Sequence, residues 1–238
     1  MKKTLTLYLL VILFTINACA SQGTAASEPL PATEPAVSAA TQVPNVVSPT
    51  EVGQSANTKL YANSAFGFSF QYPSNWFGPD EYVSGQDLRV AIGSDVVYPY
   101  GTMPEQPSEV RNSYYVVMQY SKNNQNQYWK DTYQSLLKLK DGESFSDARS
   151  LVIRVGQLKI GRFEGIEYIS TLSETARTEP VYIRQAILFD NQSNLLTIMG
   201  QPNNVEISNG TGWRDAYRMV DEANQILFHD IVKSITIE

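Results

Sequence analysis

The sequence predicts an α+β fold in which an antiparallel β-sheet is flanked by helices. Several segments alternate apolar and polar residues, as strands with one buried face do. Two other segments, residues 126–140 and 212–231, have apolar residues at helical spacing. The stretch DNQSN at residues 190–194 is rich in turn-forming side chains and joins two strand segments, which favours an antiparallel hairpin. Strands that precede, separate and follow two helices indicate one layered domain.

The first long strand is predicted at residues 66–72, which read FGFSFQY. Aromatic residues stand at every second position, so they share one face of the strand. Pro73 is expected to end the strand, because proline cannot donate a hydrogen bond to a sheet. Trp76 follows this break and can fold back over the sheet edge. We therefore expect Phe68, Phe70 and Trp76 to be core residues.

The other strands follow from the same kind of alternation. A short partner strand is expected at residues 60–62 and a closing strand at residues 234–237. Between them, strands are expected at residues 88–97, 114–120, 151–155, 160–171, 181–189 and 195–199.

Each helical segment carries one apolar stripe, which is expected to face the sheet. In the first segment the stripe consists of Trp129, Tyr133, Leu136 and Leu137. The second helix is expected to begin at residues 212–213, with Thr211 as its cap. Its stripe consists of Trp213, Tyr217, Val220, Ile226 or Leu227, and Ile231.

Residues 1–18 have the organisation of a signal peptide. Lys2 and Lys3 supply the positive charge that precedes the apolar run. That run, residues 7–14, is too short to span a bilayer comfortably. The tetrapeptide INAC at residues 16–19 resembles the bacterial lipobox. In that signal, cleavage makes the cysteine the first residue of the mature protein, and the cysteine carries acyl chains.

Cys19 is the only cysteine of the 238-residue chain, and a lipobox explains its position. Two or three acyl chains on one residue form a stable anchor, whereas a single chain binds only marginally. We therefore expect a protein anchored through Cys19 to the extracytoplasmic side of the cell membrane, with an envelope protein complex as a candidate partner. Loss of Lys2 and Lys3 with the signal peptide changes the formal net charge from -6 to -8. The alternative is an ordinary secretory signal followed by a chance cysteine.

Residues 19–57 are predicted to form a lipidated, disordered tether. The segment lacks aromatic residues, is rich in Ala, Ser, Thr and Pro, and shows neither helical nor strand periodicity. Such a composition cannot bury enough apolar surface to offset the entropy lost on ordering. A structured subdomain is the alternative. Aromatic residues recur from Lys59 onward, so residues 58–238 are expected to form one folded domain.

Two stretches of this domain resemble the PsbP-like family. FGFSFQYPSNW, at residues 66–76, resembles its opening signature, and FHDIVKSITIE, at residues 228–238, resembles its ending. The resemblance covers residues 58–238 and implies an α/β/α sandwich. It also implies a packing role for the matching residues Phe68, Phe70, Tyr72, Pro73 and Trp76. Bacterial relatives include lipoproteins without an assigned activity. Plant members are subunits of photosystem II, but this chain has no counterpart of their proposed metal-binding histidines, and residues 98–112 look like an insertion.

Composition disfavours several classes of function. A net charge of -6 repels phosphate backbones, so we expect no nucleic-acid partner. One cysteine and one histidine, His229, exclude cysteine-pair and multi-histidine metal sites. We therefore predict no catalytic residue, no metal and no cofactor.

The other titratable candidates are expected to be ordinary surface groups. His229 and Asp230 are neighbours whose side chains diverge on a helix, so His229 is predicted to lie on the helix surface. The carboxylate pairs Asp221–Glu222 and Asp141–Glu143 lack the spacing of a calcium loop and are predicted to be solvated.

The best candidates for partner binding are Tyr98 and Tyr100, which lie in the loop sequence YPYG. Tyrosines on such loops are common at protein interfaces, although both rings could instead pack back onto the domain. We therefore expect a non-catalytic binding or assembly module. The alternative is a small-molecule-binding protein or a hydrolase, which needs a pocket with convergent polar groups.

Overall fold

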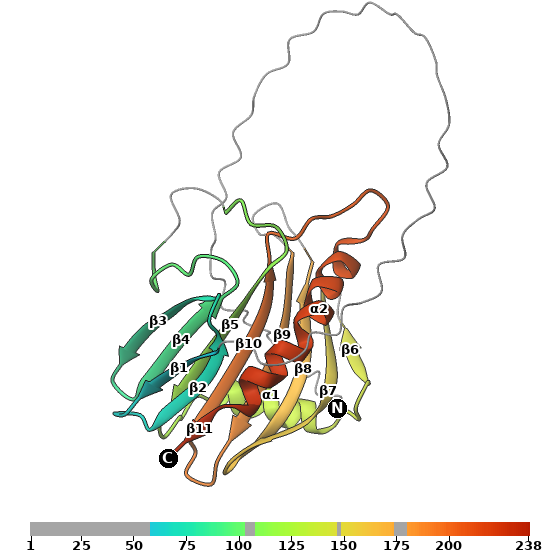
Figure 1. Cartoon of the computed structure of the whole chain (residues 1–238). Coiled ribbons are helices and arrows are strands. Elements are labelled where there is room, and N and C mark those ends of the chain that lie inside the picture. Colours follow the sequence, from blue (N-terminus) through green and yellow to red (C-terminus); the bar gives the residue numbers. More distant parts are fainter. Residues whose placement is uncertain (1–57, 103–107, 147–148, 174–179) are drawn as a thin grey trace, which may run out of the picture. The chain divides into compact units, whose positions relative to one another are not determined.

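A computed structural model describes residues 58–102, 108–146, 149–173 and 180–238. The predicted signal peptide, Cys19 and the tether of residues 19–57 lie outside the described residues. The described part consists of two antiparallel sheets and two helices (Figure 1). The predicted α+β class and the antiparallel pairing are therefore confirmed.

The larger sheet has eight strands in the order β3-β4-β5-β10-β9-β8-β7-β6. Each neighbouring pair is antiparallel. The strands are β3 (Phe77–Ser84), β4 (Asp87–Gly93), β5 (Ser113–Ser121), β6 (Ser144–Ser146), β7 (Ser150–Ile160), β8 (Phe163–Leu172), β9 (Val181–Phe189) and β10 (Leu195–Asn203). The predicted turn at residues 190–194 joins β9 to β10 and is confirmed, since Asp190 accepts a hydrogen bond from the Asn194 backbone N–H.

The smaller sheet has the order β1-β2-β11, with bounds Thr58–Asn63, Phe68–Pro73 and Thr236–Ile237. Strand β2 is therefore flanked by the first and the last strands of the described fold. The hydroxyl groups of Ser69 and Thr236 lie 2.5 Å apart and link β2 to β11. The predicted partner strand and the predicted closing strand are both confirmed.

The two helices cover opposite faces of the larger sheet. Helix α1 (Gln127–Leu137) packs against β8, and α2 (Trp213–Lys233) packs against β10, β5, β9 and β2. Neighbouring residues of β10 mark the two faces, because successive strand side chains point in opposite directions. Leu196 belongs to the cluster that contains α2 residues, and Leu195 to the cluster that contains α1 residues. Among the residues described, neither helix is long and apolar enough to cross a membrane.

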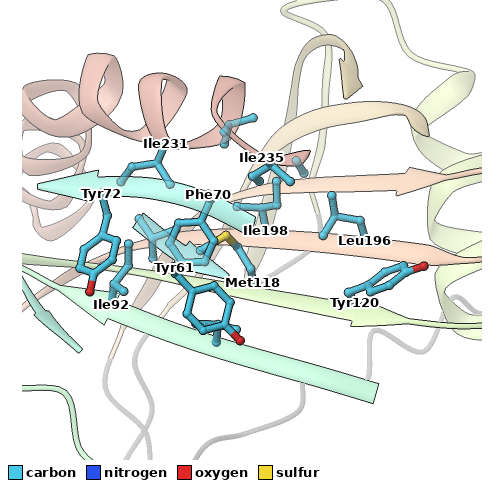
Figure 2. Close-up of a cluster of buried hydrophobic side chains, with 14 of the residues drawn as sticks. Tyr61, Phe70, Tyr72, Ile92, Met118, Tyr120, Leu196, Ile198, Ile231 and Ile235 are labelled. Atoms are coloured by element: carbon cyan, nitrogen blue, oxygen red, sulfur yellow. The ribbon is translucent and has the colours of Figure 1, made fainter. Parts of the chain in front are cut away.

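The main core lies between the smaller sheet, α2 and one face of the larger sheet. Phe68 and Phe70 are 1% and 0% exposed, and Trp76 is also buried, as the aromatic alternation predicts. The Phe68 ring stacks on Tyr120 of β5, with 6.1 Å between ring centroids. Figure 2 shows Phe70 in the middle of this cluster, beside Tyr61 and Met118.

Several predicted boundaries were wrong. The predicted strands at residues 151–155 and 160–171 are in fact β7 and β8, which meet at a tight turn after Ile160. Gly161 occupies this turn with φ of +54°, a conformation that glycine adopts at little cost. The predicted strand at residues 88–97 ends earlier, at Gly93. Strands β3 and β6 were not predicted, because both are largely exposed and lack an alternating pattern.

The helix predictions were correct in position but not in every contact. Thr211 does not cap α2, because the N-cap residue is Gly212, which makes no side-chain cap hydrogen bond. The Thr211 backbone N–H instead donates to the carbonyl of Ser208 in the preceding turn. In α1, Leu136 is buried, but Leu137 is 41% exposed and lies outside the buried stripe.

Candidate functional site

The predicted loop residues Tyr98 and Tyr100 lie at the end of the larger sheet that β3 and β4 form. Their side chains are 40% and 41% exposed, respectively. The Tyr100 ring lies 4.6 Å from the ring of Tyr82 on β3, measured between centroids. The Arg89 guanidinium of β4 lies 4.8 Å from the Tyr100 ring centroid, within the range of a cation–π contact. We call Tyr82, Arg89, Tyr98 and Tyr100 the tyrosine surface.

The pairing of β3 with β4 positions this surface. Tyr82 and Arg89 are directly opposite each other in the antiparallel ladder, so their side chains share a face. The Asp80 carboxylate holds both Arg89 and Tyr100 in place. It accepts a hydrogen bond from Arg89 Nη1 at 3.0 Å and another from the Tyr100 backbone N–H at 3.1 Å. Burial lowers the pKa of Arg89. The nearby Asp80 carboxylate raises this pKa again, but it offsets the effect of burial only in part. The Arg89–Asp80 pair is 16% and 15% exposed, so it supports the rings from below.

The segment that carries Tyr98 is anchored to β5. Tyr115 donates a hydrogen bond to the carbonyl of Val96 at 3.0 Å. Burial raises the pKa of the Tyr115 hydroxyl, and the Asp95 carboxylate and Tyr98 add to the shift. Tyr115 is therefore a neutral donor at physiological pH. The segment that carries Tyr98 and Tyr100 is therefore held in place. Both rings remain partly exposed, and the Tyr100 ring also packs back onto Tyr82 and Arg89.

A second cluster, which the sequence did not predict, lies beneath α2. Arg184 of β9 binds both oxygens of Asp221 through Nε at 3.1 Å, and Nη2 lies 2.6 Å from Oδ2. Its Nη1 donates to Glu167 of β8 at 2.5 Å. His229 Nε2 lies 3.0 Å from Glu167 Oε2. Tyr114 donates to Asp221 at 2.9 Å, which completes the buried charge network.

Two surface assignments are overturned by this network. Asp221 is fully buried, so it is not solvated, although its neighbour Glu222 is exposed as predicted. His229 is not a plain surface residue, because its side chain is only 28% exposed and contacts Glu167. Position in the strand could have revealed the network: Arg184 stands in β9 between residues that face the core. A charge at such a position requires a buried partner.

The other predicted carboxylate pair is mostly as expected. Glu143 is exposed, and Asp141 is 62% exposed. Asp141 nevertheless lies 2.9 Å from Arg154 Nε. The same guanidinium donates to the carbonyls of Leu136 and Leu139, at the end of α1. Arg154 therefore ties β7 to the C-terminus of the helix, which is a structural role.

The buried charge network has the properties of a structural element, because its charged groups bind one another. Burial by itself would raise the pKa of Glu167, but hydrogen bonds from His229 and Arg184 outweigh burial and lower it. A general base needs a pKa near the operating pH. The pKa of Glu167 is shifted away from that range, so Glu167 is poorly suited to act as a general base.

Two shallow cavities among those that the described residues form have polar or mixed linings. One, of about 440 Å³, is lined by polar side chains that include Lys122 and Arg162. Both cations already have partners: Arg162 pairs with Asp190 at 3.0 Å, and Lys122 donates to the carbonyl of Ala65 at 3.1 Å. The other, of about 380 Å³, lies along one side of α2 and includes Met219. Within the described ranges, no group of three or more His, Cys, Asp or Glu side chains could hold a metal ion.

No protein-family model and no curated protein matches this chain. One similar solved structure is a crystal structure from Bacteroides thetaiotaomicron at 1.50 Å resolution, with 15% sequence identity and a TM-score of 0.30. The match covers 76% of this chain and 48% of the Bacteroides chain. The chain thus spans about half the length of that protein.

Proposed function

We propose that the chain is a lipid-anchored protein on the extracytoplasmic side of the cell membrane, and that its folded part is a non-catalytic binding or assembly module. The observation that supports the lipid anchor is the sequence INAC at residues 16–19, which follows a positively charged N-terminal segment and an apolar run. The anchor holds the module near the membrane, where a tether raises its effective concentration toward neighbouring partners.

We further propose that residues 58–238 form a PsbP-like domain. The motifs at residues 66–76 and 228–238 support this assignment. An antiparallel sheet with one helix on each face is the arrangement expected of an α/β/α sandwich. In this proposal Phe68, Phe70 and Trp76 serve packing, and the module acts through its surface.

The tyrosine surface is the part of the described fold best suited to recognition. Tyrosine is enriched at protein interfaces, because its ring combines apolar contact with a hydrogen-bonding hydroxyl. Tyr82, Tyr98 and Tyr100 are each at least 40% exposed. The Arg89–Asp80 pair cancels its own charge, so the surface favours a partner that is not strongly charged.

The anchor predicts that Cys19→Ala abolishes lipidation, because Cys19 supplies the only thiol. Cells that produce either form should be labelled with a radioactive or alkyne-bearing fatty acid. The wild-type protein should carry label and sediment with membranes. The variant should be unlabelled and either released or retained as precursor. Equal labelling of the two forms would refute the anchor.

The binding role predicts that the double substitution Tyr98→Ser, Tyr100→Ser removes a specific neighbour of the anchored protein. Cross-linked neighbours should be captured from intact cells and compared by quantitative mass spectrometry. We expect the same partner to be depleted on the order of tenfold, as for interface tyrosines. The control is Met219→Ser, a 61% exposed position on α2, outside the tyrosine surface. Identical neighbours for all three proteins would contradict the proposal.

A further inference from the structure

The outer edge of β3 is unpaired among the residues that the structure describes. Strand β3 stands at one end of the larger sheet, where it pairs with β4 (Figure 1). A bulge between Phe77 and Asp80 interrupts its first half, which leaves a regular edge over residues 80–84. Unpaired edges present free backbone N–H and C=O groups, and these can pair with another strand.

The hairpin geometry shows which backbone groups face outward. Ser84 and Asp87 are opposite each other across a two-residue loop, and such loops close on a hydrogen-bonded pair. The next pair, Val83 and Leu88, is therefore not hydrogen-bonded, because the two kinds of pair alternate. The N–H and C=O groups of Val83 therefore point outward, away from β4. Glu81 is two residues away along the strand, so its N–H and C=O groups also point outward.

Three large apolar or aromatic side chains of β3 are exposed to solvent. Tyr82 is 44% exposed and Val83 is 46% exposed, and they point to opposite faces of the sheet. Phe77, at the start of the strand, is 47% exposed. A second strand laid along the edge would find apolar contacts on both faces as well as free hydrogen-bonding groups.

We propose that a second copy of this chain occupies this edge, with the two β3 strands antiparallel and centred on Tyr82. In this register Glu81 of each copy is opposite Val83 of the other. All four residues turn their backbone groups toward the partner, so four backbone hydrogen bonds form. The two copies of Tyr82 form the non-hydrogen-bonded pair, in which cross-strand side chains are closest and aromatic pairs are favourable.

Other symmetric registers are less favourable. Centring on Glu81 brings two carboxylates together and places Pro79, which has no N–H, opposite Val83. Centring on Val83 places Glu81 opposite Gly85, which already lies in the turn. With Tyr82 at the centre, Asp80 is instead opposite Ser84, so no like charges meet. The inference rests on the geometry of β3 and does not depend on the proposed function.

Cysteine cross-linking tests the register directly. The chain from residue 19 onward, with Cys19→Ser, has no other thiol, so each introduced cysteine can react only with a second copy. In the proposed dimer, the Cα atoms of the two cysteines introduced by Tyr82→Cys are about 4.5 Å apart. This distance is within the Cα–Cα range of a disulfide. We expect Tyr82→Cys to form dimers at least tenfold faster than Leu60→Cys, whose position is also on an edge strand and 68% exposed. Equal rates would overturn the proposal.

Sedimentation velocity tests the association itself. The Cys19→Ser protein is expected to sediment at twice the monomer mass at micromolar concentration. Val83→Pro removes an outward N–H that the hairpin does not use, and should sediment as a folded monomer. If this variant does not fold, Tyr82→Lys serves instead, because two like charges at the axis should weaken the dimer about tenfold. A protein that remains monomeric at all concentrations, or a dimer that both variants leave unchanged, would show that β3 is not the interface.

Discussion

Replacing Phe70 with alanine is expected to lower the free energy of unfolding by about 3–5 kcal/mol, the usual cost of truncating a buried phenylalanine. The Phe70 side chain is 0% exposed. Its ring lies between those of Tyr61 and Tyr72, with centroid distances of 5.0 and 5.8 Å. A domain has only about 5–15 kcal/mol of stability in all. Phe70→Ala should therefore unfold the domain or strongly reduce its denaturant midpoint, as followed by tryptophan fluorescence.

The matched control is Leu60→Ala on the adjoining strand β1. Leu60 is 68% exposed, so its truncation should change the free energy of unfolding by no more than about 0.5 kcal/mol. A Phe70→Ala protein that kept its midpoint but lost a binding partner would mean that the aromatic face of β2 is a recognition surface.

Asp221→Ala should have the second large effect, because it removes one partner of a buried ion pair. Breaking such a pair costs about 3–5 kcal/mol, since the remaining charge stays buried. Glu167 still binds Arg184 in the variant, which places the expected loss near the lower end, at about 3 kcal/mol. Tyr114 also loses the acceptor of its hydroxyl. Urea denaturation monitored by circular dichroism measures this loss.

Glu222→Ala provides the comparison at the next residue of α2. Glu222 pairs with Arg218 at 3.0 Å, but both side chains are about half exposed, so the loss should stay below about 1 kcal/mol. Arg184→Met in the Asp221→Ala background should cost less than the sum of the two single changes, because the residues share one network. Additive losses would show that the two residues act independently.

Local patterns were sufficient to predict most of the fold. The alternation in β2, the apolar stripe of α2 and the polar turn before β10 each specify an element from residues that are close in sequence. Strand β3 could not be found in this way, because it is exposed on both faces and gains its conformation from pairing with β4. Edge strands of this kind show no alternation of apolar and polar residues in the sequence.

The candidate sites show the same division. Tyr98 and Tyr100 stood out because a loop with two tyrosines is informative by itself. Their neighbours Tyr82 and Arg89 are brought to them only by the pairing of β3 with β4. The ion pair of Arg184 with Asp221 joins residues 37 positions apart, and α2 must dock on β9 before the two meet. Sequence periodicity cannot predict such a contact, because it reflects only residues that are close in sequence.

The position of β2 between β1 and β11 bears on when the chain can fold. The aromatic face of β2 is covered by α2, and its outer edge is paired by residues 236–237. A polypeptide that has emerged only as far as β10 can form hairpins, but it cannot close its core. Contacts between such distant segments also form slowly. The chain must therefore be almost completely synthesised before residues 58–238 become compact.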